Sequence, residues 1–328
     1  MQRNTDTLER GSRFELGALG WSDFYAEPFG PYREDGLIPG RVAIQFNRSY
    51  RLYAELGEIS VDSSGSLRHR AAHRAELPAV GDWVAVRRDP QGGAIEAVLP
   101  RKSVLSRKGT GRVPEEQVMA ANVDIVFLVL GLDHELNLPR VERYLTAARE
   151  SGAQPVVLLN KDDLVDDVGE RIREVASMAP DVPVHAISSE RDRGLEVVRS
   201  YLRFGQTIAL LGSSGVGKTT LINRLLGEER FPTQDVSLTD SKGRHTTTRR
   251  QLTVLPQGGL LMDTPGMREF EGWEGTRAES QLFADIEEIE AQCRFSNCRH
   301  GTEQGCAVQR AIAEGSLDPT RVEDYCRI

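Results

Sequence analysis

The first third of the chain alternates apolar and polar positions over short distances. Between Gly40 and Val104, five short runs follow this pattern, and turn-rich segments such as 62–65 and 89–93 separate them. A period of two is typical of β-strands, and several short strands at this spacing predict a small closed barrel, of the oligonucleotide-binding (OB) type. Small barrels also serve as docking modules, so the fold alone does not identify a ligand. The predicted strands are 41–46, 50–53, 57–61, 83–86 and 94–98.

The pattern changes after Asp124, where longer apolar runs alternate with helical stretches. This alternation indicates an α/β fold with a mostly parallel, doubly wound sheet. Predicted strands are 125–130, 156–159, 182–187, 208–211, 252–255 and 260–262, and predicted helices are 139–151, 169–178, 194–202 and 219–226. The expected parts are an N-terminal arm or small helical extension (1–37), the OB-fold-like barrel (38–113), the doubly wound domain (114–275) and a helical C-terminal domain (276–328).

Charge is spread unevenly over the 328 residues, whose net charge is −8. The barrel segment 38–113 holds 13 Lys and Arg against seven Asp and Glu, whereas the rest of the chain is acidic. One basic segment in an acidic protein suggests a local anionic partner, although an ordinary solvated surface would look the same. The longest apolar run, 125–132, is much shorter than the ~20 residues of a membrane-spanning helix, and no secretory signal is readable. We therefore expect a cytoplasmic protein with no membrane partner.

A phosphate-binding loop lies after the apolar run that ends at Leu211. The segment fits G-x-x-x-x-G-K-[ST] without exception and precedes a helical stretch, which is the context that this motif requires. Its backbone N–H groups surround phosphates at a helix N-terminus, its lysine reaches the β- and γ-phosphates, and the following threonine hydroxyl binds Mg²⁺. The predicted nucleotide-binding residues here are Gly212, Ser213, Ser214, Gly215, Val216, Gly217, Lys218, Thr219 and Thr220.

A second phosphate-side element is the segment 263–266, which follows the apolar run 260–262. Asp263, at the end of a strand, is placed to hold Mg²⁺, and the N–H of Gly266 is placed to sense the γ-phosphate. Alone, the segment would read equally well as an ordinary turn. Downstream of a phosphate-binding loop, the functional interpretation is favoured.

The residues Asn160, Lys161, Asp162 and Asp163 follow the apolar run 156–159 and form the predicted base site. A carboxylate accepts hydrogen bonds from both N1–H and the 2-amino group of guanine, and adenine offers neither donor, so Asp163 is the candidate for selecting guanine. Asn160 is expected to contact the purine edge and support the loops, and the stem of Lys161 to cover the ring. A polar turn would look similar. Ser188, with Ser189, is a weaker candidate for a base contact through backbone N–H groups.

The motifs occur in an unusual order, because the base motif precedes the phosphate-binding loop. A doubly wound sheet tolerates this order, since each motif lies at the carboxyl end of a strand and spatial position makes the site. The order resembles that of circularly permuted GTPases. Within them, four strings resemble the family of the ribosome small-subunit-dependent GTPase A (RsgA, also called YjeQ): 212–218, 243–248, 263–268 and the Cys/His pattern of 293–308.

The resemblance covers about residues 40–324 and implies an OB barrel, a permuted GTPase domain (114–275) and a zinc domain. It further implies a GTPase that acts late in maturation of the small ribosomal subunit and contacts its rRNA, and we expect a monomer. Relatives typically continue beyond the helix that begins near Asp318, so the resemblance leaves the contacts of a longer tail open. Two alternatives are a GTP-gated RNA-binding scaffold with incidental hydrolysis and a P-loop kinase or ATPase, against which the base motif argues.

Hydrolysis is the least familiar part of the predicted chemistry. Ras-like enzymes orient the attacking water with a Gln after the Asp-x-x-Gly glycine, whereas this chain has Met267 there. His245 is the obvious substitute, and the family is thought to use this position. A surface histidine that contacts RNA or solvent is the alternative. Among Thr246, Thr247 and Thr248, Thr247 is favoured as a further Mg²⁺ ligand; together with Lys218 and His245 it forms the predicted catalytic set.

Three cysteines and one histidine lie within 14 residues near the C-terminus. Three thiolates and one imidazole complete a tetrahedral zinc shell with no open position, which is typical of a structural site. Unligated thiols in a helical segment are the alternative, and isolated Cys326 is not expected to take part. The predicted ligands of one structural Zn²⁺ are Cys293, Cys298, His300 and Cys306.

Overall fold

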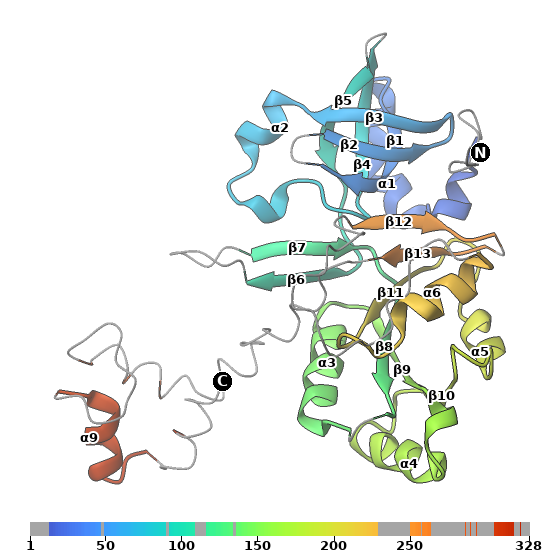
Figure 1. Cartoon of the computed structure of the whole chain (residues 1–328). Helices are drawn as coiled ribbons and strands as arrows, with labels where there is room; N and C mark the ends of the chain where they lie inside the picture. Colours follow the sequence, from blue (N-terminus) through green and yellow to red (C-terminus); the bar gives the residue numbers. More distant parts are fainter. Residues whose placement is uncertain are drawn as a thin grey trace, which may run out of the picture. The chain divides into compact units, whose positions relative to one another are not determined.

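The computed structural model describes 13–46, 49–89, 92–108, 116–133, 136–228, 250–256 and 258–263, together with 286, 289, 293, 305–317 and 322. The chain divides into two compact units, Met1–Phe270 and Glu271–Ile328. The predicted boundary between barrel and GTPase domain, at 113/114, falls outside the described residues, so that boundary stays a prediction. Figure 1 shows a barrel and an α/β part within the first unit.

The N-terminal extension packs against the barrel through aromatic side chains. A 3₁₀ turn η1 (Leu16–Leu19) leads to helix α1 (Asp23–Glu34), on which Tyr25 and Phe29 are buried. The ring of Trp21 lies edge-on to that of Trp83, with 4.7 Å between centroids, and Trp83 is completely buried. Helix α1 lies within the segment 1–37, the expected arm or small helical extension, and packs on part of the barrel.

The barrel consists of β1 (Ile38–Gln45), β2 (Ser49–Ala54), β3 (Gly57–Ser63), β4 (Trp83–Asp89) and β5 (Gly92–Val98). The strand order is β1-β2-β3-β5-β4, and pairing of β4 with β1 closes the barrel. The helix α2 (Gly65–Arg70) and the 3₁₀ turn η2 (Arg74–Glu76) connect β3 to β4. The predicted closed barrel of five strands is confirmed. Its core residues are Val42, Tyr50, Leu52, Val61, Leu67, Val84, Val86 and Ile95.

The α/β part contains five parallel strands in the order β10-β9-β8-β11-β13. They are β8 (Ile125–Gly131), β9 (Gln154–Asn160), β10 (Val184–Ala186), β11 (Thr207–Leu211) and β13 (Leu260–Asp263). Antiparallel β12 (Gln251–Val254) continues the sheet beyond β13. The predicted mostly parallel sheet is present.

Helices cover both faces of this sheet. They are α3 (Leu138–Glu150), α4 (Val168–Met178), α5 (Leu195–Ser200) and α6 (Lys218–Leu226). Side chains of α5 and α6 share one buried cluster with Ile125, Phe127 and Val129 of β8. The intervening residues Val126 and Leu128 point to the other face and are also fully buried. Figure 1 shows α3 on the opposite side of the strands from α5 and α6.

Two features of the fold have no counterpart among the predicted elements. The basic tract after the barrel forms a hairpin, β6 (Val104–Lys108) with β7 (Glu116–Ala121), whose apolar side chains Leu105 and Met119 are buried. In addition, β12 pairs with β1, so the barrel and the α/β part share one continuous sheet of 11 strands. The hydroxyl of Tyr53 supports this pairing by donating to the carbonyl of Leu252.

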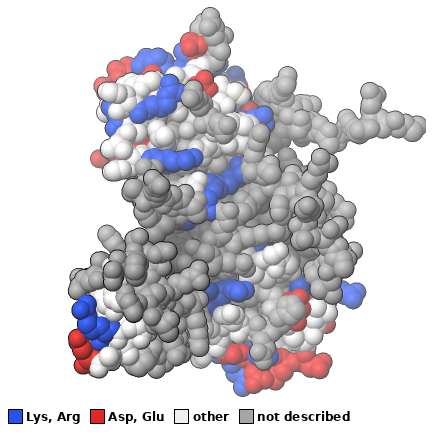
Figure 2. Space-filling model, turned by 60° about the vertical axis from the view of Figure 1, so that its left-hand side comes forward, with Lys and Arg blue, Asp and Glu red and all other residues white. Residues whose placement is uncertain are grey.

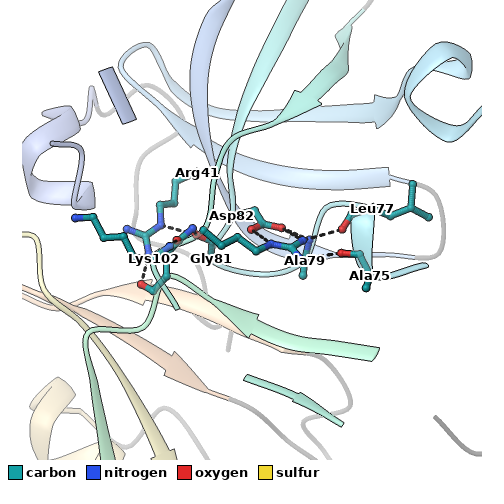
Figure 3. Close-up of polar contacts among 9 residues, drawn as sticks. Arg41, Ala75, Leu77, Ala79, Gly81, Asp82 and Lys102 are labelled. Carbon is teal, nitrogen blue, oxygen red and sulfur yellow. Dashed lines mark hydrogen bonds and ion pairs between the residues drawn. The ribbon is translucent and has the colours of Figure 1, made fainter. Parts of the chain in front are cut away.

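The buried Arg41 joins the N-terminal extension, the barrel and the α/β part, and the half-buried Arg101 fixes the connection before β4 (Figure 3). Arg41, which is 1% exposed, donates hydrogen bonds to four groups: the carbonyls of Leu19, Gly81 and Asn122, and the hydroxyl of Thr207.

Arg101 forms a two-pronged ion pair with the fully buried Asp82, with both N–O distances at 2.7 Å. Arg101 also donates to the carbonyls of Ala75 and Leu77, which holds η2 in place. Burial would lower the pKa of Arg101, but the hydrogen bonds and charge of Asp82 outweigh it and raise that pKa.

The described part of the C-terminal unit consists mainly of helix α9 (Ala307–Ala313). Ile286, Cys306, Val308, Ala311, Leu317 and Val322 form its buried cluster. Among the described residues of the whole chain, no helix is both long and apolar enough to cross a membrane.

Replacement of Arg101 by Met should destabilise the barrel, because it leaves the Asp82 carboxylate buried without its partner. Loss of one partner of a buried pair costs about 3 kcal/mol or more. We expect a clearly lower urea midpoint, followed by the fluorescence of the tryptophans, of which Trp83 is buried beside this pair. The control Arg149→Met removes an exposed pair with Asp181, and its expected cost is less than about 1 kcal/mol. Equal midpoints for the two variants would contradict the importance of the buried pair.

Candidate GTP-binding site

The phosphate-binding loop depends on glycines at its close contacts. A side chain at Gly212, where φ is +151°, would place its Cβ 2.2 Å from the carbonyl oxygen of Val129. A Cβ at Gly217, where φ is +95°, would lie 2.2 Å from Nδ2 of Asn160. Only glycine fits such positions without moving the neighbouring backbone or loop. The loop therefore runs close to both β8 and β9 before it enters α6.

Polar side chains contact this loop at the N-terminus of α6. The ammonium of Lys218 donates to the carbonyls of Gly212 and Ser213, so its charge lies inside the loop. Arg140 of α3 donates to the hydroxyl of Ser213 at 2.8 Å. Backbone N–H groups at a helix N-terminus and a lysine within the loop form an anion site that is suited to phosphate.

Asn160 connects the base motif to the phosphate-binding loop. Its side chain is 2% exposed, and its Nδ2 donates to the carbonyl of Val216 at 2.8 Å. Its Oδ1 accepts hydrogen bonds from the backbone N–H and the hydroxyl of Ser189, at 2.9 and 3.0 Å. One side-chain amide therefore ties together the loops that follow β9, β10 and β11. Its predicted loop-supporting role is seen directly, and its contact with the purine edge stays a prediction.

The two adjacent aspartates of the base motif have different surroundings. Asp162 is buried and forms an ion pair with Arg193, whose Nη2 lies 2.7 Å from Oδ1 of Asp162. Asp163 is half-buried and has a looser neighbour, Arg191, at 3.7 Å. Asp162 is thus occupied by a structural ion pair, whereas Asp163 is the carboxylate that remains accessible for a base.

Asp163 stays ionised at neutral pH. A hydrogen bond from the Ser188 side chain is the main cause that holds the pKa of Asp163 below its ordinary 3.8, and the charges of Arg191 and Arg193 act in the same direction against partial burial. An ionised carboxylate only accepts hydrogen bonds. It therefore matches the two donors of guanine and no acceptor of adenine.

Ser188 and Ser189 are 0% and 2% exposed, and both backbone N–H groups have partners inside the protein. That of Ser188 donates to the carbonyl of Arg193, and that of Ser189 donates to Asn160. The hydroxyl of Ser188 also accepts from the N–H of Arg191. In the described geometry Ser188 positions Asp163, and the predicted base contact through its N–H stays untested.

Lys161 adopts a left-handed conformation, with φ +66°, and pairs with Asp133 after β8. This contact holds the lysine stem beside the base loop, and its predicted cover of the ring stays a prediction. The arginines Arg140, Arg191 and Arg193 and the acidic Asp133 were not found from the sequence, because no motif includes them. The clustering of Arg191 and Arg193 three to five residues after Ser188 is the only available signal.

The remaining predicted residues lie at the same edge of the sheet or outside the described residues. Thr219 and Thr220 lie in the first turn of α6, and Asp263 ends β13, which pairs with β11. Gly266, His245 and Thr247 lie outside the described residues, as do Cys298 and His300. Ser214 and Gly215 lie in the loop between β11 and α6.

In this fold the base loop, which comes first in the chain, lies beside the phosphate-binding loop, which comes later. This arrangement defines a circularly permuted P-loop GTPase.

A model of the RsgA GTPase family matches residues 98–273. One relative is the small ribosomal subunit biogenesis GTPase RsgA of Opitutus terrae, which is 47% identical to this chain. The match covers 94% of this chain and 88% of the relative. The chain belongs to the RsgA GTPase family.

Solved structures give the same result for the fold. YjeQ from Thermotoga maritima superimposes with a TM-score of 0.57 at 28% identity, over 89% of this chain and 96% of its own. YloQ, described as a circularly permuted GTPase, matches with a TM-score of 0.52 at 22% identity, over 89% of this chain and 93% of its own. The predicted family, permuted GTPase fold and GTPase activity are confirmed.

Replacement of Asp163 by Asn should shift base preference from guanine toward xanthine. The amide presents a donor where guanine presents one, and sites built around such hydrogen bonds discriminate by roughly 100-fold or more. Competition of xanthosine, guanosine and adenosine triphosphates for a fluorescent nucleotide measures the shift. The control Asp162→Asn changes the neighbouring carboxylate, which pairs with Arg193, and should keep guanine preference. Unchanged selectivity in the Asp163 variant would refute this assignment.

Proposed function

We propose that this GTPase binds the small ribosomal subunit and assists its late maturation, that the subunit stimulates hydrolysis, and that hydrolysis releases the protein. The observation that carries the proposal is the nucleotide site itself, in which Asn160 joins three loops and presents Asp163 at its edge. The name of the relative from Opitutus terrae supports the choice of partner.

Mg²⁺ accompanies GTP in this proposal. The ion favours oxygen ligands, and it is commonly held by one or two protein groups and by phosphate oxygens. Thr219 at the start of α6 and Asp263 at the end of the neighbouring β13 provide a hydroxyl and a carboxylate at the same edge of the sheet. Thr247 is proposed as a third ligand, and Gly266 as the sensor of the γ-phosphate.

Hydrolysis requires a water molecule to be oriented for attack on the γ-phosphate, and Met267 offers no useful hydrogen bond for this purpose. We assign this role to His245, whose neutral imidazole can accept a hydrogen bond from water. Lys218 neutralises charge on the β- and γ-phosphates. In this proposal the subunit places His245 and Thr247 for catalysis, so turnover is slow in isolation and faster on the subunit.

The barrel is the proposed RNA-binding element, of the OB type. Its strand order, β1-β2-β3-β5-β4 with closure of β4 on β1, forms a small closed barrel of the kind that binds oligonucleotides. The segment 38–113 has a net charge of +6, opposite in sign to the rest of the chain. Positive charge attracts the phosphate backbone of rRNA. The protein works as a cytoplasmic monomer in this proposal.

One structural Zn²⁺ is proposed for the C-terminal unit. The sulfur atoms of Cys293 and Cys306 lie 3.9 Å apart, too far for a disulfide and close to the ~3.8 Å between two ligands of a tetrahedral site with Zn–S bonds of about 2.3 Å. Backbone N–H groups of Ala307 and Gln309 donate to these sulfurs, as suits thiolates. Among the described residues this pair has no third ligand nearby, and the proposed others are Cys298 and His300.

A GTP-gated RNA-binding scaffold with incidental hydrolysis is the second candidate. The observation that favours it is Met267, which leaves the attacking water without the usual glutamine. In such a protein, GTP would control RNA affinity while hydrolysis stayed slow in every complex.

Multiple-turnover hydrolysis should be slow for the protein alone and at least roughly tenfold faster with purified small subunits, as partner-assisted GTPases are. His245→Ala should lose the stimulated rate and still bind GTP, because the base and phosphate loops are unchanged. Arg173→Ala, at an exposed position of α4 outside the barrel, is the control and should respond like the wild type. No stimulation of the wild type would favour the scaffold, and full stimulation of His245→Ala would remove the role of His245.

Purified protein should contain one zinc per chain by elemental analysis. Cys306→Ser should lose the metal and lower the stability of α9 and its buried cluster, while GTP binding by the first unit is retained. Cys326→Ser is the matched control, because this cysteine stands outside the predicted ligand set, and it should keep the metal. Zinc retained at full occupancy in Cys306→Ser would contradict the proposed shell.

A further inference from the structure

Arg140 brings a second cation to the phosphate-binding loop. It is the third residue of α3, whose start is fixed by Asn137, because Oδ1 of Asn137 accepts from the N–H of Arg140 at 3.0 Å. From there the side chain of Arg140 reaches the loop after β11, where its Nη1 donates to the hydroxyl of Ser213 at 2.8 Å. The contact of α3 with the nucleotide site therefore ends in a positive charge.

The donors of this guanidinium are only partly used. A guanidinium has five N–H donors, and the partner that the described residues provide for Arg140 is the hydroxyl of Ser213. Its Nε is buried without a hydrogen-bond partner among them, and Arg140 forms no ion pair with any described residue. Buried donors in native proteins are nearly always paired. A shift of the guanidinium toward a bound oxyanion would satisfy these donors and balance the charge.

Ser213 lies at the end of the loop that faces the outer phosphates. The ammonium of Lys218 extends back from α6 to the carbonyls of Gly212 and Ser213, and the lysine of this motif is the group that reaches the β- and γ-phosphates. The inner phosphates lie instead against the backbone N–H groups of the loop. Arg140 and Lys218 thus meet at one residue, on the γ-phosphate side. Two cations in one place favour a highly charged anion, and a triphosphate carries more charge than a diphosphate.

We propose that Arg140 binds the γ-phosphate of GTP and thereby gives the site a preference for the triphosphate over the diphosphate. Arginine suits this task because its planar fork matches two oxygens of one phosphate group. P-loop GTPases use an arginine on the transferred phosphate, which their own chain or a partner supplies. Here α3 supplies it from the same chain. This role depends on GTP binding and not on the proposed ribosomal partner, so the isolated protein tests it.

The test compares the affinities of the full chain for GDP and for guanosine 5′-(β,γ-imido)triphosphate, each in competition with a fluorescent GDP. Arg140→Met should weaken binding of the triphosphate analogue roughly tenfold, in line with loss of a charged hydrogen bond. Its affinity for GDP should stay close to the wild-type value, because GDP lacks the γ-phosphate. Arg140→Lys keeps the charge without the fork, and its preference should lie between those of the wild type and Arg140→Met. Equal weakening of both nucleotides would overturn the proposal.

A double-mutant cycle with Ser213 separates direct contact from support of the loop. If Arg140 only held Ser213 in place, Arg140→Met would cost nothing further in a Ser213→Ala background. We expect it to weaken binding of the triphosphate analogue roughly tenfold in that background as well, because the guanidinium contacts the phosphate itself. No additional loss in the double variant would show a purely structural role and overturn the proposal.

Arg173→Met is the matched control for general loss of positive charge, because it removes an exposed arginine from α4. At the lower end of the α/β part, where Figure 1 places α4, Figure 2 shows acidic and basic side chains together. Arg171 pairs with Glu174 on this helix. The control should keep both nucleotide affinities close to the wild-type values. If Arg173→Met weakened binding of the analogue as much as Arg140→Met, net charge would explain the effect and the proposal would fail.

Discussion

The buried guanidinium of Arg41 is the interaction on which the arrangement of the first unit depends. It lies on a barrel strand, yet its hydrogen bonds end on the N-terminal turn, on the segment before β4, and on the approaches to β8 and β11. A fully buried charge is expensive unless every donor has a partner. Because these partners come from distant parts of the chain, the charge is tolerated only when all of them are in place.

This requirement explains why the barrel and the GTPase sheet form one unit. The strand β11 begins at Thr207, which is a partner of Arg41, and ends at the phosphate-binding loop. The other end of the nucleotide site is closed by the side-chain amide of Asn160, which spans the loops after β9, β10 and β11. Strand β11 is therefore held at both ends. The buried charge of Arg41 contacts Thr207 at its start, and the neutral amide of Asn160 contacts the phosphate-binding loop that follows its end. Chain order has no part in either contact, so a permuted sequence forms the same site.

The strands of both halves were predictable, because their burial follows simple periodicity. The barrel strands alternate, and β8 is a continuous apolar run that is buried on both faces. The phosphate-binding loop and the base motif were also predictable, because each needs particular residues at fixed spacing. The different roles of Asp162 and Asp163 were not predictable, because they depend on Arg193, which approaches from the loop between β10 and α5.

Other features depend on long-range pairing and left no local signal. The strand β6 reads as part of a basic linker because Ser106, Arg107 and Lys108 are polar, although the last four residues of its partner β7 are all buried. The pairing of β1 with β12 joins residues about two hundred positions apart. The orientation of Ser188 toward Asp163, rather than toward a base through its N–H, similarly requires the bridge to Arg193. Periodicity reports the burial of a strand and not the identity of its neighbour.

The continuous sheet has a consequence for the independence of the two halves. In an ordinary GTPase the last strand of the sheet is an edge, protected by its own residues. Here β12 has β1 as its neighbour, so a fragment that lacked the barrel would expose backbone groups of β12 that are paired in the whole protein. Exposed edges of this kind favour intermolecular association. The barrel therefore covers the edge that β12 would otherwise present to solvent.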